Sequence, residues 1–304
     1  MNILISGGTG FLGKYFYSYW RSKGYSVDSI GRGNTNEIVF DLSKSTPNLS
    51  KEYDYFIHCA GKAHMVPKND KEAKEFYLVN EFGTNFFLNA ISNQKKKPKG
   101  VLIVSSASVY GLTFGELINE KTLLNAKDPY GKSKISSEKI AIEWGNLNNI
   151  KISIIRLPLV VGKNPPGNLA AMINAIKAGK YFNIAGGIAK KSMVLATDVA
   201  SFSFNLINIG GIYNLTDSRH PNFNELSHVI ANNYGITNLK NIPFFTAKIL
   251  SRICEVLNNI FKLKIPFTRV TLNKMTLDLT FDDEKARKIG WKPNSVINNS
   301  HKWL

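Results

Sequence analysis

The sequence is poor in cysteine, in acidic residues and in long apolar runs, and each shortage argues against a class of protein. Its 304 residues include two cysteines, Cys59 and Cys254, and neither lies in a Cys-x-x-Cys pair. A disulfide framework and a bound zinc or other metal are therefore not expected. No apolar run is long enough to cross a bilayer, and the first residues, MNILISGGTG, lack the basic segment of a signal peptide. We expect a cytoplasmic protein without a transmembrane segment.

The shortage of acidic residues leaves a formal net charge of +17, from 39 Lys and Arg against 22 Asp and Glu. A basic surface attracts nucleic acid, anionic lipid or phosphorylated metabolites. The densest basic run, Lys95–Lys97, falls between a helical pattern and a strand pattern and is typical of a solvated loop. Because no nucleic-acid motif accompanies the charge, we predict no nucleic-acid partner.

Short apolar runs alternate with helical patterns through the first half of the chain. We expect strands at 2–6, 25–30, 54–58, 100–105 and 150–156, and helices at 12–23, 71–93 and 130–147. This alternation predicts parallel β-α-β units, and hence a Rossmann-like, doubly wound α/β sheet. Ligands bind such sheets at the carboxyl ends of the strands.

The pattern changes after about residue 157. We expect a loop at 157–167, then a strand at 212–215 and helices at 168–178, 222–234 and 243–263. These elements predict a smaller C-terminal lobe that binds substrate. We assign residues 1–165, with parts of 190–220, to a dinucleotide-binding domain, and 166–304 mainly to this lobe.

The stretch 244–263 is both apolar and basic, which is typical of an amphipathic helix. Such a helix either lies on a membrane surface or packs on its own protein. Packing is the favoured interpretation, and peripheral membrane contact is the alternative.

Gly7, Gly10 and Gly13 follow the first strand at G-x-x-G-x-x-G spacing and open the first helix. Glycine permits the tight turn and lets the backbone approach a pyrophosphate, and the helix N-terminus then supplies N–H groups to the anion. The context predicts a dinucleotide-binding loop. We expect its cofactor contacts to come from Gly7, Gly10, Phe11, Leu12 and Gly13, together with Ala60 after the strand at 54–58.

The end of the second strand carries Gly31 and Arg32, where a ribose-binding carboxylate would favour NAD. A guanidinium pairs well with the 2′-phosphate of NADP. NADP(H) is therefore favoured over NAD(H), although Arg32 can also be read as one surface arginine among many basic residues. We expect Asp41 and Leu42, after the next strand, to contact the adenine.

Tyr130 and Lys134, in YGKSK, share one helix face, and an ammonium beside a phenol lowers the tyrosine pKa. The tyrosine can then exchange a proton with a substrate oxygen. Ser105 and Ser106 end a buried strand, where a hydroxyl can bind the same oxygen. Taken separately, an i,i+4 surface pair and a serine-rich turn would explain these residues equally well.

The order of these motifs resembles that of the extended short-chain dehydrogenase/reductase superfamily, close to its nucleotide-sugar epimerase/dehydratase group. The resemblance covers nearly the whole chain and rests on GGTGFLG (7–13), HCAGKAH (58–64), YLVNEFGTNFFLNA (77–90), SSASVYG (105–111), PYGKSK (129–134) and RLPLVVG (156–162).

The resemblance implies roles for the matching residues. Tyr130 would be the acid/base, Lys134 would bind the nicotinamide ribose and tune the tyrosine, and Ser106 would orient the substrate with Ser105 beside it. It also implies a homodimer, and a nucleotide-diphosphate sugar as substrate. The matching substrate-side positions are Asn80 in the active-site wall, and Asn168 and Lys191 facing the diphosphate.

Two departures from the family pattern narrow the activity. Sugar dehydratases carry an Asp-Glu pair before VYG, where this sequence has Ala107 and Ser108, so the usual 4,6-dehydration is not expected. Epimerases usually keep the ribose-binding acid that Gly31 and Arg32 replace. The sequence therefore predicts NADPH-dependent 4-keto reduction of a UDP-linked 4-keto-6-deoxy (N-acetyl)hexosamine. Segments 62–66 and 156–173 also resemble bacterial enzymes that make such sugars for surface polysaccharides.

Two alternatives stay open. One is an NAD-dependent C4 epimerase of a UDP-sugar or a polyprenyl-linked sugar. The other is a non-catalytic dinucleotide sensor or RNA-associated protein on the same fold, against which the intact Tyr130 and Lys134 argue.

Overall fold

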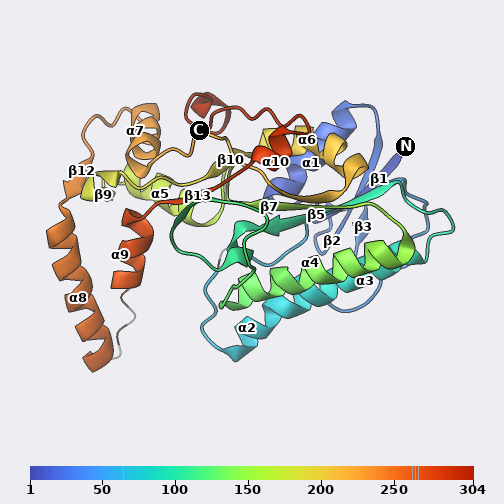
Figure 1. Ribbon diagram of the computed structural model, residues 1–304, viewed down its shortest axis with the longest axis horizontal. Helices are drawn as coiled ribbons and strands as arrows, with labels where there is room; N and C mark the ends of the chain where they lie inside the picture. Colours follow the sequence, from blue (N-terminus) through green and yellow to red (C-terminus); the bar gives the residue numbers. More distant parts are fainter. Residues whose placement is uncertain (64, 262, 264, 266) are drawn as a thin grey trace.

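The computed structural model describes residues 1–63, 65–261, 263, 265 and 267–304. Its centre is a seven-stranded sheet in the order β11-β7-β5-β4-β1-β2-β3, with every pairing parallel (Figure 1). The strands are β1 (Asn2–Ser6), β2 (Ser26–Gly31), β3 (Ile38–Val39), β4 (Tyr55–His58), β5 (Gly100–Ser106), β7 (Ile152–Leu157) and β11 (Gly211–Asn214). This confirms the predicted doubly wound α/β sheet. His64, which ends the motif at 58–64, lies outside the described residues.

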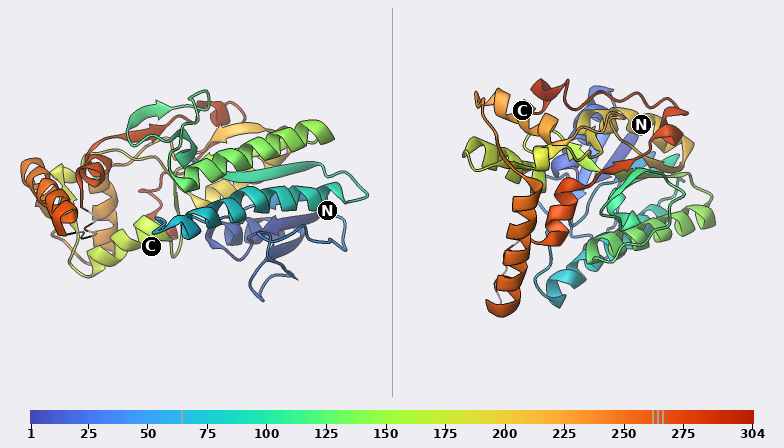
Figure 2. Two further views of the ribbon diagram at one scale, coloured as in Figure 1. Left: turned by 90° about the horizontal axis from the view of Figure 1, so that it is seen from below. Right: turned by 60° about the vertical axis from the view of Figure 1, so that its left-hand side comes forward.

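Helices cover both faces of the sheet (Figures 1 and 2). One face carries α1 (Phe11–Ser22), α6 (Ala196–Ile209) and α10 (Glu284–Arg287), and the other carries α2 (Asp70–Phe76), the π-helical segment η1 (Tyr77–Phe82), α3 (Gly83–Ser92) and α4 (Pro129–Asn148). The segments η1 and α3 continue α2 without a break, so the helix expected at 71–93 is interrupted by one π-helical segment. Helix α4 follows separately, after β5 and β6.

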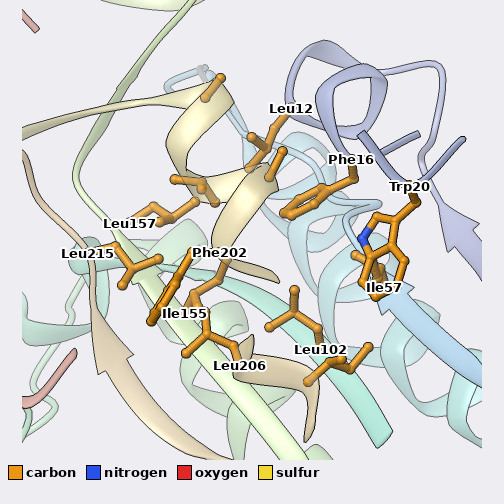
Figure 3. Packing of buried hydrophobic residues seen from close by; sticks show 14 of the residues in the cluster. Leu12, Phe16, Trp20, Ile57, Leu102, Ile155, Leu157, Phe202, Leu206 and Leu215 are labelled. Carbon is orange, nitrogen blue, oxygen red and sulfur yellow. The ribbon is translucent and has the colours of Figure 1, made fainter. Parts of the chain in front are cut away.

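Successive side chains of a strand point to opposite faces of the sheet, so each buried strand contributes residues to two hydrophobic cores. Ile3 and Ile5 pack with Phe16 and Trp20 on the α1 side, whereas Leu4 packs with the α3 side. Figure 3 shows the first of these cores, in which Phe16 and Trp20 are fully buried beside strand and α6 side chains. The double burial explains why these strands read as continuous apolar runs.

The remaining elements form short sheets and a smaller lobe (Figure 1). They are η2 (Ala107–Tyr110), β6 (Gly115–Ile118), β8 (Leu159–Val161), α5 (Gly167–Lys177), β9 (Phe182–Ile184), η3 (Ala185–Gly187), β10 (Met193–Leu195), α7 (Phe223–Asn233), β12 (Lys240–Ile242), α8 (Phe244–Phe261), α9 (Arg269–Thr276), β13 (Leu279–Phe281) and η4 (Ser300–Lys302).

The prediction of a loop at 157–167 is wrong for the residues at its centre. Residues Leu159–Val161 form β8, which pairs in parallel with β10, and Val161 is fully buried. The partner strand lies more than 30 positions along the chain, so local pattern alone does not identify the pairing.

The prediction that the apolar residues of 244–263 pack against the protein itself is also wrong for most of them. In α8, only Ala247 and Ser251 are buried, while eight large apolar side chains are exposed. Lys262 lies outside the described residues. In the described part of the chain, every helix is too short or too polar to cross a bilayer.

Candidate active site

The glycine loop connects the end of β1 to the start of α1 and packs against the residues that follow β4. A Cβ on Gly13 would come within 2.0 Å of the Gly7 carbonyl oxygen, and one on Gly7, whose φ is +70°, would come within 2.8 Å of the Ala60 nitrogen. The α1 N-cap, Gly10, offers no side-chain hydrogen bond to the helix. The loop therefore combines close backbone approach with open helical N–H groups, and these residues fit the pyrophosphate of a dinucleotide.

The two residues after Gly10 differ in exposure. Leu12 is buried in the core and Phe11 is half-buried, with its ring edge-on to Tyr15 at a centroid distance of 6.0 Å. Cofactor contacts of Phe11 and Leu12 can thus use their backbone N–H groups, which open the helix.

The end of β2 leaves Arg32 exposed beside Gly31. Partial burial opposes ionisation of Asp41, but hydrogen bonds from Ser43 and the nearby Arg32 charge outweigh it and lower the pKa of that carboxyl. Arg32 and Asp41 therefore share one polar edge of the sheet. The Leu42 side chain is buried in the core on the α3 side, which gives no support to its predicted contact with adenine.

Asp28, in the body of the second strand, lies away from this edge. Its Oδ2 accepts hydrogen bonds from Lys51 Nζ and Tyr53 Oη, each at 2.8 Å. Glu37, just before β3, also contacts β2, where its Oε2 accepts the Ser29 N–H at 2.7 Å and the Ser29 hydroxyl at 2.8 Å. Arg32 is the charged residue that directly follows β2, with the engaged carboxylate of Glu37 nearby.

The three predicted catalytic residues come from β5 and α4. Ser106 is the last residue of β5, and Tyr130 and Lys134 lie in the first turns of α4, which Asp128 caps by accepting the Gly131 N–H at 2.9 Å. Ser106 Oγ accepts the Ser108 N–H at 3.2 Å, which leaves its own proton to donate. The arrangement presents a serine hydroxyl and a phenol at the carboxyl edge of the sheet.

The electrostatics of this group differ from the expectation. Lys134 is buried and its Nζ donates to the Val104 carbonyl at 2.6 Å, and burial lowers the pKa of this ammonium to about 8. Burial raises the pKa of the Tyr130 phenol, and its hydrogen bond with Ser106 offsets only part of the rise. The lowered tyrosine pKa expected from Lys134 is therefore not found, because desolvation outweighs the other effects.

Two predicted substrate contacts are engaged elsewhere. Ser105 Oγ donates to Glu138 Oε1 at 2.5 Å inside the protein. Asn80 Nδ2 donates to Ser133 Oγ at 2.9 Å, and Asn80 Oδ1 accepts the Lys62 N–H at 2.8 Å. The structure thus gives Ser105 and Asn80 supporting roles: they hold α4 and the loop after β4 in place, and their predicted substrate contacts lack support.

In the smaller lobe, Asn168 is exposed in the first turn of α5. Lys191 is half-buried, and its Nζ donates to the Leu277 carbonyl at 2.8 Å. Burial lowers the pKa of Lys191 to about 8. The predicted diphosphate contacts of Asn168 and Lys191 stay predictions. The side chain of Lys191 is held in place by its hydrogen bond to Leu277, whereas that of Asn168 is exposed.

Sequence reasoning missed a buried ion pair behind the catalytic helix. Arg156 on β7 and Glu138 on α4 lie 2.7 Å apart, with side chains 3% and 2% exposed. Arg156 also donates to Tyr110 Oη at 3.2 Å, and Tyr110 donates to Asn214 on β11 at 2.7 Å. Through these contacts the pair links α4 to β7, η2 (Ala107–Tyr110) and β11, one helical turn beyond Lys134.

Sequence reasoning considered Ser108 only as a departure from the dehydratase pattern. Among the described residues, its hydroxyl is buried without a hydrogen-bond partner. It lies two residues from Ser106, at a position where dehydratases carry an acid. This buried hydroxyl therefore has unused hydrogen-bonding capacity beside Ser106.

His58 anchors a second buried network, between β1 and the helices. Its Nδ1 lies 2.7 Å from Ser6 Oγ and its Nε2 lies 3.0 Å from Thr84 Oγ1, and Thr84 in turn contacts Ser137 on α4. Burial, with Lys134 acting in the same direction, lowers the pKa of His58 from 6.5 to about 3. His58 is therefore neutral in the folded protein at neutral pH.

We expect this histidine to make the fold sensitive to acid. Between its unfolded value of 6.5 and its folded value of about 3, only the unfolded chain takes up the proton. The free energy of unfolding should therefore fall as pH drops through this window, by up to about 1.4 kcal/mol per pH unit from this group. Denaturant unfolding at a series of pH values measures the slope. His58→Asn should flatten it, whereas the exposed His301→Asn should not; equal slopes in both variants would contradict the assignment.

Comparison with known proteins places these features in a family context. The pattern of the "NAD dependent epimerase/dehydratase family" matches residues 3–215, about two thirds of the chain. A sterol-4-alpha-carboxylate 3-dehydrogenase, decarboxylating, of Dictyostelium discoideum is 28% identical, with 95% of each chain covered. An N-acetyl-alpha-D-glucosaminyl-diphospho-ditrans,octacis-undecaprenol 4-epimerase of Escherichia coli O157:H7 is 27% identical, over 71% of this chain and 66% of that protein.

A solved structure has the same fold over almost the whole chain. RMD from Pseudomonas aeruginosa, complexed with NADPH, superposes with a TM-score of 0.74 at 19% identity and covers 99% of this chain and 96% of its own. At this identity the likeness concerns the fold alone.

Proposed function

Because the chain belongs to the NAD dependent epimerase/dehydratase family, we propose that it reduces the 4-keto group of a UDP-linked 4-keto-6-deoxy (N-acetyl)hexosamine with NADPH. The observation that carries this proposal is the end of β2, where the exposed Arg32 follows Gly31 in place of a carboxylate. A guanidinium there favours a 2′-phosphate, and a cofactor consumed once per turnover suits a reductase.

The protonation state of Tyr130 is compatible with the proposed reduction. Since burial raises its pKa, the phenol keeps its proton at neutral pH. Reduction of a ketone requires a proton donor at the carbonyl oxygen. The resting form of Tyr130 is the donor.

The residues of the site divide the work of the proposed reaction. When bound, the reduced nicotinamide would supply a hydride to the sugar carbonyl carbon. Tyr130 gives its phenolic proton to the carbonyl oxygen, which becomes the C4 hydroxyl, and Ser106 donates a hydrogen bond to that oxygen as charge develops on it. Lys134 would bind the ribose of the dinucleotide, and Lys191 would neutralise the substrate diphosphate. We keep a homodimer as part of this proposal.

The direct test measures NADPH oxidation by the purified protein with UDP-4-keto-6-deoxy sugars, with NADH as the comparison. Consumption of NADPH with formation of one 4-hydroxy product is the expected result. If neither cofactor is consumed with any such sugar, the proposed reduction is wrong.

We expect Arg32→Gln to shift cofactor preference. Loss of a charge-assisted contact to the 2′-phosphate, worth about 1.5–3 kcal/mol, should weaken NADPH binding by about 10- to 100-fold and leave NADH binding unchanged. Fluorescence titration of both cofactors measures the change. The exposed Lys139→Gln, which also removes one positive charge, serves as the control. Equal losses for both cofactors would argue against a 2′-phosphate contact.

A C4 epimerase is the second candidate, because a relative named as an epimerase of an undecaprenol-linked sugar matches 71% of the chain. Such an enzyme would retain its NAD through purification and interconvert C4 epimers without net consumption of cofactor. Analysis of the nucleotide released on denaturation, together with an assay of UDP-GlcNAc and UDP-GalNAc interconversion, separates the two candidates.

A further inference from the structure

Helix α8 exposes a continuous apolar face that the active site does not use. Five large apolar side chains recur along it at intervals of three or four residues, which places them on one side of the helix. They are Phe245, Ile249, Ile253, Val256 and Ile260, with 73%, 44%, 49%, 53% and 64% of their surface exposed. From the first to the last, the face extends about 22 Å along the helix axis.

The helix extends away from the body of the protein. Ala247 and Ser251, its two buried residues, lie on the side opposite this apolar face, and Ala247 packs with Leu272 of α9 and Ile184 of β9. Figures 1 and 2 show α8 projecting beyond the smaller lobe with α9 beside it. The exposed face is therefore presented outward along the length of a protruding helix, where a broad surface can meet it.

Basic residues accompany the apolar face. Between positions 240 and 276 the sequence has seven Lys or Arg residues and one acidic residue, Glu255. Glu255 is already engaged, since its Oε2 accepts from Arg269 Nε at 2.7 Å. Lys248 and Arg252, which are exposed on α8, follow the helix at i,i+4 spacing along the edge of the apolar face.

This combination of exposed apolar residues and flanking cations matches an anionic bilayer surface. Apolar side chains enter the acyl boundary while lysine and arginine remain at the headgroups. A second copy of the chain fits less well: two such faces in contact would bring the Lys248 and Arg252 rows together, and the nearest carboxylate is paired with Arg269. Like charges in that position oppose association.

We propose that α8 docks the protein on membranes that contain anionic lipid, with the axis of the helix parallel to the membrane plane and its face of Phe245, Ile249, Ile253, Val256 and Ile260 inserted at the interface. This binding is independent of the reaction proposed above. It would hold the smaller lobe near the membrane, because α9 directly follows α8. The Leu277 carbonyl, which accepts from Lys191 Nζ, comes directly after α9.

Vesicle flotation with the full-length protein tests the proposal. The protein should float with vesicles of phosphatidylcholine mixed with phosphatidylglycerol, bind more weakly to phosphatidylcholine alone, and lose binding as salt rises. Ile253→Gln/Ile260→Gln should weaken binding by about tenfold or more, because two apolar side chains no longer enter the interface. Lys248→Gln/Arg252→Gln should remove most of the preference for anionic vesicles.

The matched control replaces two exposed leucines elsewhere. Leu123→Gln/Leu147→Gln alters side chains that are 78% and 87% exposed and lie outside α8, and it should leave vesicle binding unchanged. Dinucleotide binding, measured in every variant, reports that the fold is intact. Absence of wild-type binding to anionic vesicles overturns the proposal. So does a wild-type oligomer that Ile253→Gln/Ile260→Gln dissociates without any change in vesicle binding, which would assign the face to self-association.

Discussion

Tyr130→Phe is expected to reduce turnover by about 100- to 10,000-fold while dinucleotide binding is retained. The phenyl ring keeps the packing of Tyr130 against Phe76, whose ring centroid lies 6.0 Å away. What the variant lacks is the proton for the substrate oxygen, and Ser106 can stabilise that oxygen but has no base to replenish its own proton. Steady-state rates with saturating NADPH and substrate measure the effect.

The control for this prediction is Tyr234→Phe, which removes a phenol from the end of α7. Its turnover should equal that of the wild type. If Tyr130→Phe were as active as the wild type in every assay, Tyr130 would not be the proton donor, and the non-catalytic dinucleotide sensor considered for this sequence would regain support.

Glu138→Leu is expected to lower the free energy of unfolding by about 3–5 kcal/mol. The substitution leaves the guanidinium of Arg156 without a counter-charge in a site that is 3% exposed, and it removes the acceptor of the Ser105 hydroxyl. Removing one partner of a buried pair costs far more than the pair itself contributes, because the remaining charge stays desolvated. Equilibrium unfolding in urea measures the difference.

The double variant Glu138→Leu/Arg156→Met tests the reason for this loss. With both charges gone, most of the lost stability should return, since apolar residues of similar size can replace a buried pair at little cost. Glu284→Gln, which breaks an exposed pair with Lys288 at 2.9 Å, should cause no measurable change. A double variant as unstable as Glu138→Leu would show that packing, and not the unpaired charge, causes the loss.

Much of the central sheet could be predicted because its strands carry their own signal. β1, β4 and β5 are apolar runs that end at polar residues, and β7 is an apolar run that ends before Pro158, with helical patterns between them. The short strands outside the central sheet could not be predicted, because they carry no such local signal. β13, for example, has three residues and pairs with β6, more than 150 positions earlier, so nothing in its local pattern indicates a partner.

The residues of the candidate site could be predicted only where their spacing along the chain determines how close they lie in space. The loop of Gly7, Gly10 and Gly13 and the pair of Tyr130 and Lys134 each lie within one or two turns of backbone. Glu138 and Arg156 come from different elements, and only the packing of α4 on β7 brings them together. The exposure of α8 was equally out of reach, since a packed helix and an interfacial helix share one amphipathic pattern.

The core of the dinucleotide-binding half has a consequence for how the protein is made. Trp291, which follows α10, packs against Phe202 at a centroid distance of 5.1 Å and donates its indole N–H to the Thr216 carbonyl at 3.0 Å. With Ala286 it belongs to the same cluster as Ile3 and Phe16. The ribosome must therefore synthesise the chain through Trp291 before the earliest strand acquires its complete set of neighbours, so this half of the protein should complete its packing late in synthesis.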